Sequence, residues 1–170
     1  LWFETTVEDP GHGQAGAALR SDADLIVAAG GDGTVRAVCE EAALTGVAVG
    51  IVPLGTGNLL ARNLGVPLNI RDALEVLFAG QDKAIDLGTY RTDSGIDTSF
   101  LVMAGLGMDA AIMTGVNDQL KEKVGWLAYF VSGVKAARFP AVKVQISVDG
   151  GEFRKFRART VAVGNVGFLQ

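Results

Sequence analysis

A glycine-rich turn, Gly30-Gly31-Asp32-Gly33-Thr34, most constrains what this chain can fold into. It follows the apolar run 25–29 and precedes a helix-like segment, 35–44. A strand that ends on glycines and leads into a helix leaves a nest of backbone N–H groups at the positive end of that helix. This geometry suits a phosphate group, although the same residues also make an ordinary turn.

A second glycine-rich turn strengthens the phosphate hypothesis. The segment Pro53-Leu54-Gly55-Thr56-Gly57-Asn58 follows the strand-like run 47–52 and precedes a helix-like run, 59–64. Thr56 offers a hydroxyl beside two open backbone amides. Two such turns after successive strands predict a nucleotide phosphate site.

Other polar side chains each allow two interpretations. Asp32 either positions a magnesium ion or water near phosphates, or bonds its own backbone in a turn. Asn58 either caps the next helix or contacts substrate, and Arg62 either neutralises phosphate or is solvated. Asp86 lies between apolar neighbours, and as a buried acid it would need a polar or metal-linked network. The same interpretation applies to Asp109, for which the neighbouring sequence gives weaker support.

The pattern of the first half predicts an α/β domain over residues 1–84. The expected strands are 1–6, 24–29 and 47–52, and the expected helices are 14–20, 35–44, 59–64 and 70–79. Near-continuous apolar strands separated by helices are typical of a parallel sheet that is covered on both faces.

The pattern changes after about Lys83, and residues 85–170 predict part of a second domain. The expected strands are 83–90, 98–104, 141–148 and 157–163, with one long helix over 118–138. Alternation of apolar and polar residues over 142–148 is typical of a half-exposed antiparallel strand. The predicted fold class is therefore α/β: a parallel-sheet nucleotide-binding domain, then part of a mostly antiparallel β domain with one long helix.

Composition excludes several classes of function. The net charge of −4 gives no support for nucleic-acid binding. Cys39, the only cysteine, excludes a disulfide framework and indicates a reducing, cytoplasmic setting; we expect it to be a small core residue. His12, the only histidine, is expected to be a solvated loop residue and not a catalytic base. No apolar run is long enough to form a transmembrane segment.

Three motifs in order resemble the diacylglycerol kinase catalytic domain family, which includes soluble bacterial lipid kinases and sphingosine kinases. They are the turn at 30–34, the segment 53–62 and Ile85-Asp86-Leu87-Gly88. Residues 120–130 also resemble the helix of the family's second domain, and 161–169 its Val-Gly-Asn strand. Gly-Gly-Asp-Gly alone is shared with NAD kinases and 6-phosphofructokinases, so the specificity comes from the paired motifs.

The resemblance implies an ATP-dependent phosphotransferase that acts on a lipid hydroxyl such as that of diacylglycerol. Magnesium would bridge the phosphates, and Asp32 and Asp86, the catalytic candidates, would organise it through water without serving as direct metal ligands. A general base is expected beyond Gln170. The expected nucleotide-binding residues are Thr6, Gly30, Gly31, Asp32, Gly33, Thr34, Val35, Arg36, Gly55, Thr56, Gly57 and Asn58.

The implied location is the cytoplasm, with peripheral contact at the inner membrane face where the lipid substrate lies; a homodimer is left open. Three departures from the family pattern lead us to expect a fragment that is inactive alone. A strand with an Asn-Pro loop is missing before Leu1, the later acidic motifs lie beyond Gln170, and Leu59 replaces a frequent acidic residue. Two alternatives remain. One is an NAD kinase-like enzyme, because residues 165–169 superficially resemble a motif of that family. The other is a non-catalytic nucleotide-binding module.

Overall fold

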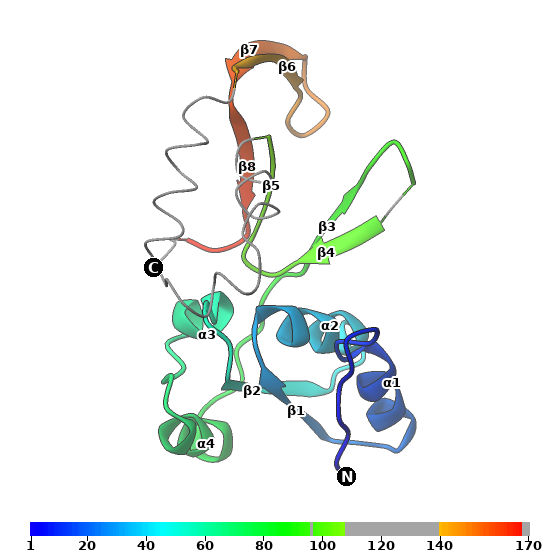
Figure 1. Cartoon of the computed structure of the whole chain (residues 1–170), viewed down its shortest axis with the longest axis vertical. Coiled ribbons are helices and arrows are strands. Elements are labelled where there is room, and N and C mark those ends of the chain that lie inside the picture. The colour runs from blue at the N-terminus through cyan, green and yellow to red at the C-terminus, as the bar shows by residue number, and fades with distance from the viewer. Residues whose placement is uncertain (96, 108–139, 168–170) are drawn as a thin grey trace. The chain divides into compact units, whose positions relative to one another are not determined.

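The computed structural model describes residues 1–95, 97–107 and 140–167 (Figure 1). The chain divides into two compact units. Unit 1 comprises Leu1–Val102 with Gly164–Gln170, and unit 2 comprises Met103–Val163. The division follows Val102, so the boundary expected between residues 84 and 85 lies inside unit 1.

Two parallel strands form the centre of unit 1. Strand β1, Leu25–Gly30, pairs with β2, Ala48–Pro53, in a register that runs from Leu25 opposite Ala48 to Gly30 opposite Pro53. Because the strands are parallel and in this register, both end at the same level of the sheet. The two glycine-rich turns therefore begin side by side.

Four helices accompany this sheet. They are α1 (His12–Arg20), α2 (Asp32–Ala42), α3 (Leu59–Leu64) and α4 (Ile70–Ala79). Helix α2 packs on both strands and on α1, while α4 packs on β2 (Figure 1). Small and branched apolar side chains make the core, among them Ala15, Ala18, Ile26, Ala28, Val35, Ala37, Val38, Ile51, Val52, Leu60 and Ala73.

Helix ends in unit 1 follow from local chemistry. The Asn69 side chain accepts a hydrogen bond from the Asp72 backbone N–H at 2.9 Å and so caps α4. Gly65, with φ of 75°, ends α3 in the left-handed conformation that glycine adopts without a steric penalty. The expected bounds of α3 and α4 match the structure.

One expectation about the sheet is wrong, and a second holds only in part. Residues 1–6 form no strand; the Thr6 backbone N–H instead donates to the Asp9 carbonyl in a turn, at 3.0 Å. The two faces of β1 are covered unequally: Ile26 and Ala28 are buried, whereas Leu25 and Val27 are 40% and 45% exposed. On that second face α4 packs over β2, where a Cβ atom added to Gly50 would lie 2.5 Å from Leu77 Cδ1, so both faces of the sheet are covered in part.

The remaining described strands pair in twos. Strands β3 (Gly88–Arg91) and β4 (Asp97–Phe100) form an antiparallel pair in unit 1. Strand β5 (Met103–Gly107) pairs with β8 (Thr160–Gly164), and β6 (Val142–Ile146) pairs antiparallel with β7 (Arg154–Ala158). These sheets are small, so the β-rich part is less continuous than expected.

Several strand boundaries differ from expectation. Residues 83–87 are irregular, so only the last part of the expected strand 83–90 forms. The expected strand 98–104 is divided by a bend at residues 101–102, and a bend at Arg159 separates β7 from β8. The helix expected over 118–138 lies outside the described residues. In the part of the chain that is described, no helix is sufficiently long and apolar to cross a bilayer.

Candidate functional site

The two glycine-rich turns are in backbone contact. The Leu54 N–H donates to the Gly30 carbonyl at 2.9 Å. A Cβ atom added to Gly55 would lie only 2.5 Å from the Gly31 Cα, and one added to Gly31 would lie 3.2 Å from the Gly55 Cα. Real Cβ atoms do not approach backbone as closely as 2.5 Å, so the contact requires glycine at Gly55. The two motifs therefore form one surface.

Asp32 joins the turns more firmly than the sequence suggested. It begins α2, and its Oδ1 accepts a hydrogen bond from the Leu59 backbone N–H at 2.6 Å, at the start of α3. A carboxylate at a helix N-terminus is favoured by the partial positive charge there. Gly57 lies against the same carboxylate, since a Cβ on it would be 2.7 Å from Oδ2. Asp32 thus caps a helix that begins 27 residues later.

Asn58 occupies the N-cap position of α3 but does not cap it with its side chain. Its backbone is left-handed, with φ of 50°, and its amide bonds back to Gly55. Gly55 N–H donates to Asn58 Oδ1 at 2.9 Å, and Asn58 Nδ2 donates to the Gly55 carbonyl at 2.7 Å. The expectation of side-chain capping by Asn58 is wrong, because this buried amide closes its own turn.

The first turn of α2 has only small or buried side chains after Asp32. Thr34 is half-buried and packs against Gly30, where an added Cβ would lie 2.7 Å from the Thr34 Cβ. Val35 is buried, with 5% of its surface exposed, and its N–H donates to the Gly31 carbonyl at 3.0 Å. A Cβ atom added to Gly33 would meet no other atom within 4 Å, so this glycine faces open space.

Two further residues flank the second turn. Thr56 is exposed. Arg62 Nε donates to the Gly57 carbonyl at 2.9 Å, so this guanidinium is held beside the turn. The second turn therefore has a cation fixed against its backbone.

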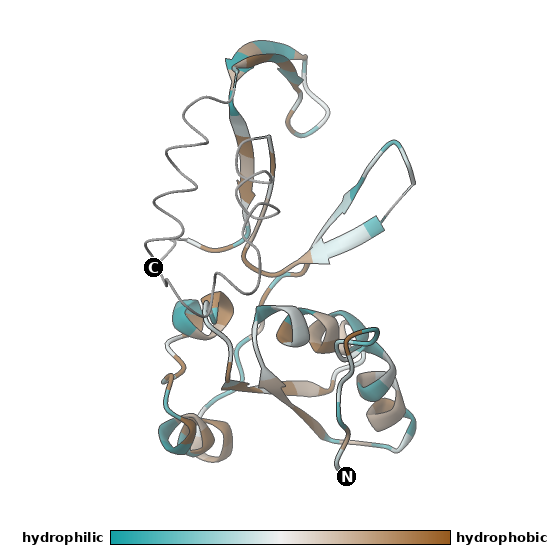
Figure 2. Cartoon of the chain, viewed as in Figure 1, coloured by the Kyte–Doolittle hydropathy of each residue, from teal (hydrophilic) through white to brown (hydrophobic). Residues whose placement is uncertain are grey.

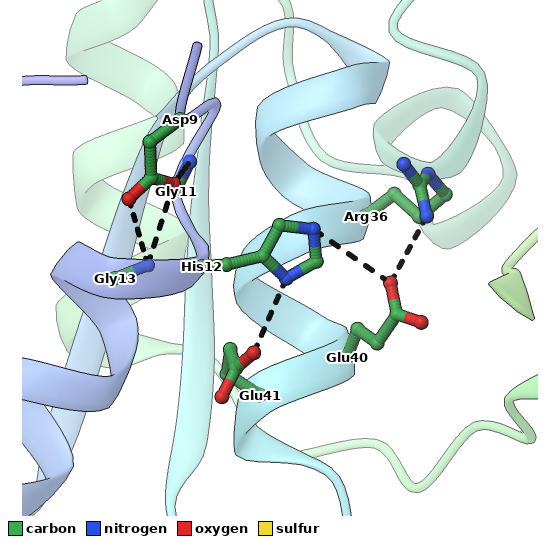
Figure 3. A network of polar contacts seen from close by, with 7 residues as sticks. All are labelled: Asp9, Gly11, His12, Gly13, Arg36, Glu40 and Glu41. Carbon is green, nitrogen blue, oxygen red and sulfur yellow. Dashed lines mark hydrogen bonds and ion pairs between the residues drawn. The ribbon is translucent and has the colours of Figure 1, made fainter. Parts of the chain in front are cut away.

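Figure 3 shows a polar network between α1 and α2. His12 is the first residue of α1 and not a loop residue, which corrects the expectation for it. Its Nδ1 lies 3.2 Å from Glu41 Oε1, and its Nε2 lies 4.0 Å from Glu40 Oε2. Arg36 donates to the same Glu40 oxygen at 3.0 Å. The Arg36 guanidinium, expected to contact nucleotide, is therefore engaged along α2.

Asp9 anchors the start of α1 in the same view (Figure 3). Its carboxylate accepts hydrogen bonds from the N–H groups of Gly11 and Gly13, both at 3.0 Å. The Asp9 N–H in turn donates to Thr6 Oγ1 at 3.1 Å. Thr6, an expected nucleotide-binding residue, thus has its hydroxyl oxygen bound within this turn.

Asp86 is exposed, so the expectation of a buried acid is wrong. Its backbone carbonyl, not its carboxylate, accepts a hydrogen bond from Asn165 Nδ2 at 2.7 Å. No group of three or more His, Cys, Asp or Glu side chains suited to a metal ion occurs among the described residues. Asp109 lies outside the described residues.

Asn165 is a residue whose position sequence reasoning missed. Its Nδ2 also donates to the Leu101 carbonyl at 3.0 Å, and its backbone N–H donates to the Val102 carbonyl at 2.8 Å. It thereby joins separate segments of unit 1. A pocket of about 270 Å³ lies here, lined by α3, residues 83–86, Leu101 and residues 165–167. The sequence signal that could have identified this residue is an Asn directly after a strand, since β8 ends at Gly164.

Cys39 is half-buried in α2. Burial raises the pKa of its thiol to about 11, because the charged thiolate is poorly solvated there. The thiol is therefore protonated at neutral pH, as expected for a packing residue and not for a nucleophile.

Known proteins resemble this chain in sequence. Residues 3–90 match the family described as the diacylglycerol kinase catalytic domain. The chain is 30% identical to a diacylglycerol kinase of Mycobacterium tuberculosis over 138 residues, which cover 80% of this chain and 44% of that protein. It is 30% identical to a diacylglycerol kinase of Staphylococcus aureus over 149 residues, which cover 83% and 44% respectively.

A solved structure has a similar fold. The crystal structure of a diacylglycerol kinase from Bacillus anthracis has a TM-score of 0.68 and 29% sequence identity, and the match covers 98% of this chain and 52% of that one. Because the family match spans slightly more than half of the chain, the chain belongs to the diacylglycerol kinase catalytic domain family. The resemblance inferred from the motifs is confirmed. The chain spans less than half the length of these curated relatives.

Proposed function

We propose that this chain is the nucleotide-binding part of an ATP-dependent lipid kinase, which transfers the γ-phosphate to a lipid hydroxyl such as that of diacylglycerol. One observation carries the proposal: the two glycine-rich turns meet at the carboxyl ends of β1 and β2, in a family of kinases. Ligands of open α/β sheets bind outside the carboxyl ends of their strands.

Several features of this surface support ATP as its ligand. Gly31 and Gly55 bring the backbones of the two turns close together, Gly57 makes room for the Asp32 carboxylate, and Gly33 faces open space. Closely spaced backbone amides of this kind suit an anion. The N-terminus of α2 adds partial positive charge, and Arg62 adds a cation beside Gly57. Asp32 holds both turns in place through the Leu59 amide, so it orients the phosphate surface through the backbone.

Magnesium would be brought by the nucleotide. In phosphoryl transfer this ion bridges phosphate oxygens and neutralises the charge that develops on them. Mg²⁺ usually keeps several waters and needs only one or two carboxylates besides the phosphates, so a cluster of three acids is not required. Asp32 and the exposed Asp86 are our candidates for organising its water shell.

The test is Mg²⁺-dependent transfer of radiolabelled phosphate from ATP to diacylglycerol in mixed micelles. This chain and a version extended at both ends would be compared, each with Asp32→Ala. We expect transfer by the extended protein and its loss in the variant, because phosphoryl transfer depends mainly on positioning. Gly55→Ala, which places a methyl group against Gly31, should also weaken ATP binding.

Two other outcomes would change the assignment. Phosphorylation of NAD but not of diacylglycerol or sphingosine by the extended protein would indicate an NAD kinase-like enzyme. ATP binding without transfer to any of these acceptors would indicate a non-catalytic nucleotide-binding module.

A further inference from the structure

The β6–β7 hairpin carries excess positive charge on a chain that is acidic overall. Residues 140–159 contain five Lys and Arg residues against two acids, Asp149 and Glu152, which gives a local net charge of +3. The whole chain has a net charge of −4. The cationic residues are Lys143, Arg154, Lys155, Arg157 and Arg159.

The strand register places three of these cations on one face of the hairpin. Lys143 is opposite Arg157, and Lys155 is opposite Gln145. All three cations are exposed, and none forms an ion pair within the described part of the chain. Like charges directly across two strands destabilise the pair. A face with such an arrangement is complementary to an anionic partner.

The turn end of the hairpin adds exposed apolar side chains. Val148 and Phe153 are each 70% exposed, and they flank the turn at Asp149 and Gly150, whose φ angles are 52° and 71°. The Ser147 hydroxyl donates to the Gly151 carbonyl at 2.6 Å and closes this turn. The hairpin contains both hydrophilic and hydrophobic segments (Figure 2).

Apolar side chains beside lysines and arginines are typical of segments that lie in the interface of a membrane. A nucleic acid would also complement the cations, but exposed Val and Phe at a tight turn offer it no hydrogen bonds to bases, and the chain as a whole is acidic. The combination of charge and an apolar tip favours a lipid surface.

We propose that the β6–β7 hairpin docks the protein on an anionic phospholipid surface. Phe153 and Val148 enter the interface, and Lys143, Lys155 and Arg157 face the lipid phosphates. The role of this docking, which is to bring the kinase to a lipid acceptor, rests on the proposed function. The docking itself does not.

Flotation of the full chain with vesicles of phosphatidylglycerol and phosphatidylcholine, compared with phosphatidylcholine alone, tests the docking. Each basic side chain near an anionic surface contributes about fivefold to partitioning. We therefore expect Lys155→Gln/Arg157→Gln to lower partitioning at least about tenfold, and raised salt to do the same. Phe153→Ser should lower it about tenfold by removing apolar burial.

A matched control removes two charges elsewhere. Arg20→Gln/Arg71→Gln changes exposed cations of α1 and α4 and should alter partitioning less than about twofold, because neither lies in the hairpin. The charge-preserving Lys155→Arg/Arg157→Lys should retain binding, which separates charge from misfolding.

Three results would overturn the docking: no binding to anionic vesicles at low salt, equal binding to neutral vesicles, or equal losses in the hairpin and control doubles. Stronger hairpin-dependent binding to single-stranded RNA than to vesicles would also overturn it. Vesicle binding is measured without ATP and phosphate transfer is measured in micelles, so either proposal can fail alone.

Discussion

At the scale of single residues, Asp32 shows how one carboxylate can organise a site through the backbone. Its Oδ1 bonds the Leu59 amide, and its Oδ2 lies where a side chain on Gly57 would be. Negative charge at the start of a helix satisfies one of the amides that lack a partner within the helix. The acid of the first motif thereby fixes the second.

We expect Asp32→Ala to lower the free energy of unfolding by about 1–2 kcal/mol, because loss of a capping acceptor leaves the Leu59 amide unpaired. Asp32→Asn keeps an oxygen acceptor at the same place and should cost less than half as much. Urea denaturation of both variants measures the difference. Equal losses would show that charge, and not capping, is what Asp32 contributes to stability.

Cys39 provides a residue-scale prediction for alkaline pH. Its pKa is raised by burial from the usual 9.0 to about 11 in the folded chain, so below pH 9 the thiol is neutral in both states and its contribution to stability is complete. Between pH 9 and 11 the unfolded chain loses the thiol proton first, and the free energy of unfolding falls. Urea denaturation at about pH 8 and about pH 10.5 measures this fall. The free energy of unfolding should fall less between these two pH values in Cys39→Ala than in the unchanged chain. Parallel curves for the two proteins would contradict this.

At the scale of elements, the packing of α4 on β2 depends on the absence of a side chain. A Cβ on Gly50 would lie 2.5 Å from Leu77 Cδ1 and 2.9 Å from Leu77 Cγ. Leu77 therefore packs directly over the backbone of the strand. The same helix is capped by Asn69, so its position is fixed by one local and one tertiary contact.

Gly50→Ala should destabilise the chain by about 1–3 kcal/mol, because the added methyl group overpacks the contact with Leu77. The double variant Gly50→Ala/Leu77→Ala makes room for that methyl group, so its loss should be smaller than the sum of the two single losses. A double-mutant cycle from urea denaturation measures this coupling. Additive losses would mean that Leu77 does not pack over Gly50.

At the scale of the whole molecule, the division into two units sets how far a local change spreads. Asp32 lies in unit 1 and the β6–β7 hairpin lies in unit 2. Cooperative units of a protein can open separately, and hydrogen exchange reports each one. We expect Asp32→Ala to speed amide exchange in peptides from residues 25–60 and to leave peptides from 142–158 unchanged. Equal acceleration in both sets would indicate one cooperative unit.

Local patterns predicted much of unit 1 because the signals were local. The apolar runs identified β1 and β2, and Gly65 and Gly80 marked the ends of α3 and α4. The turn of the β6–β7 hairpin was equally predictable, because Asp followed by Gly is favoured where two successive φ angles are positive. Strand limits in the second half were less predictable, because bends at residues 101–102 and 159 interrupt continuous apolar sequence.

Sequence by itself determined the family, the two glycine-rich turns and the helices between them, because glycine, capping and periodicity act within a few residues. Only the tertiary structure decided the partners of the polar groups: Asp32 with the Leu59 amide, Asn58 with Gly55, and Asn165 with the carbonyls of Asp86 and Leu101. Most of these bonds join residues whose approach depends on strand register and helix packing, and no local pattern records them. The exposure of Asp86 and of one face of β1 was decided in the same way, by what packs against them.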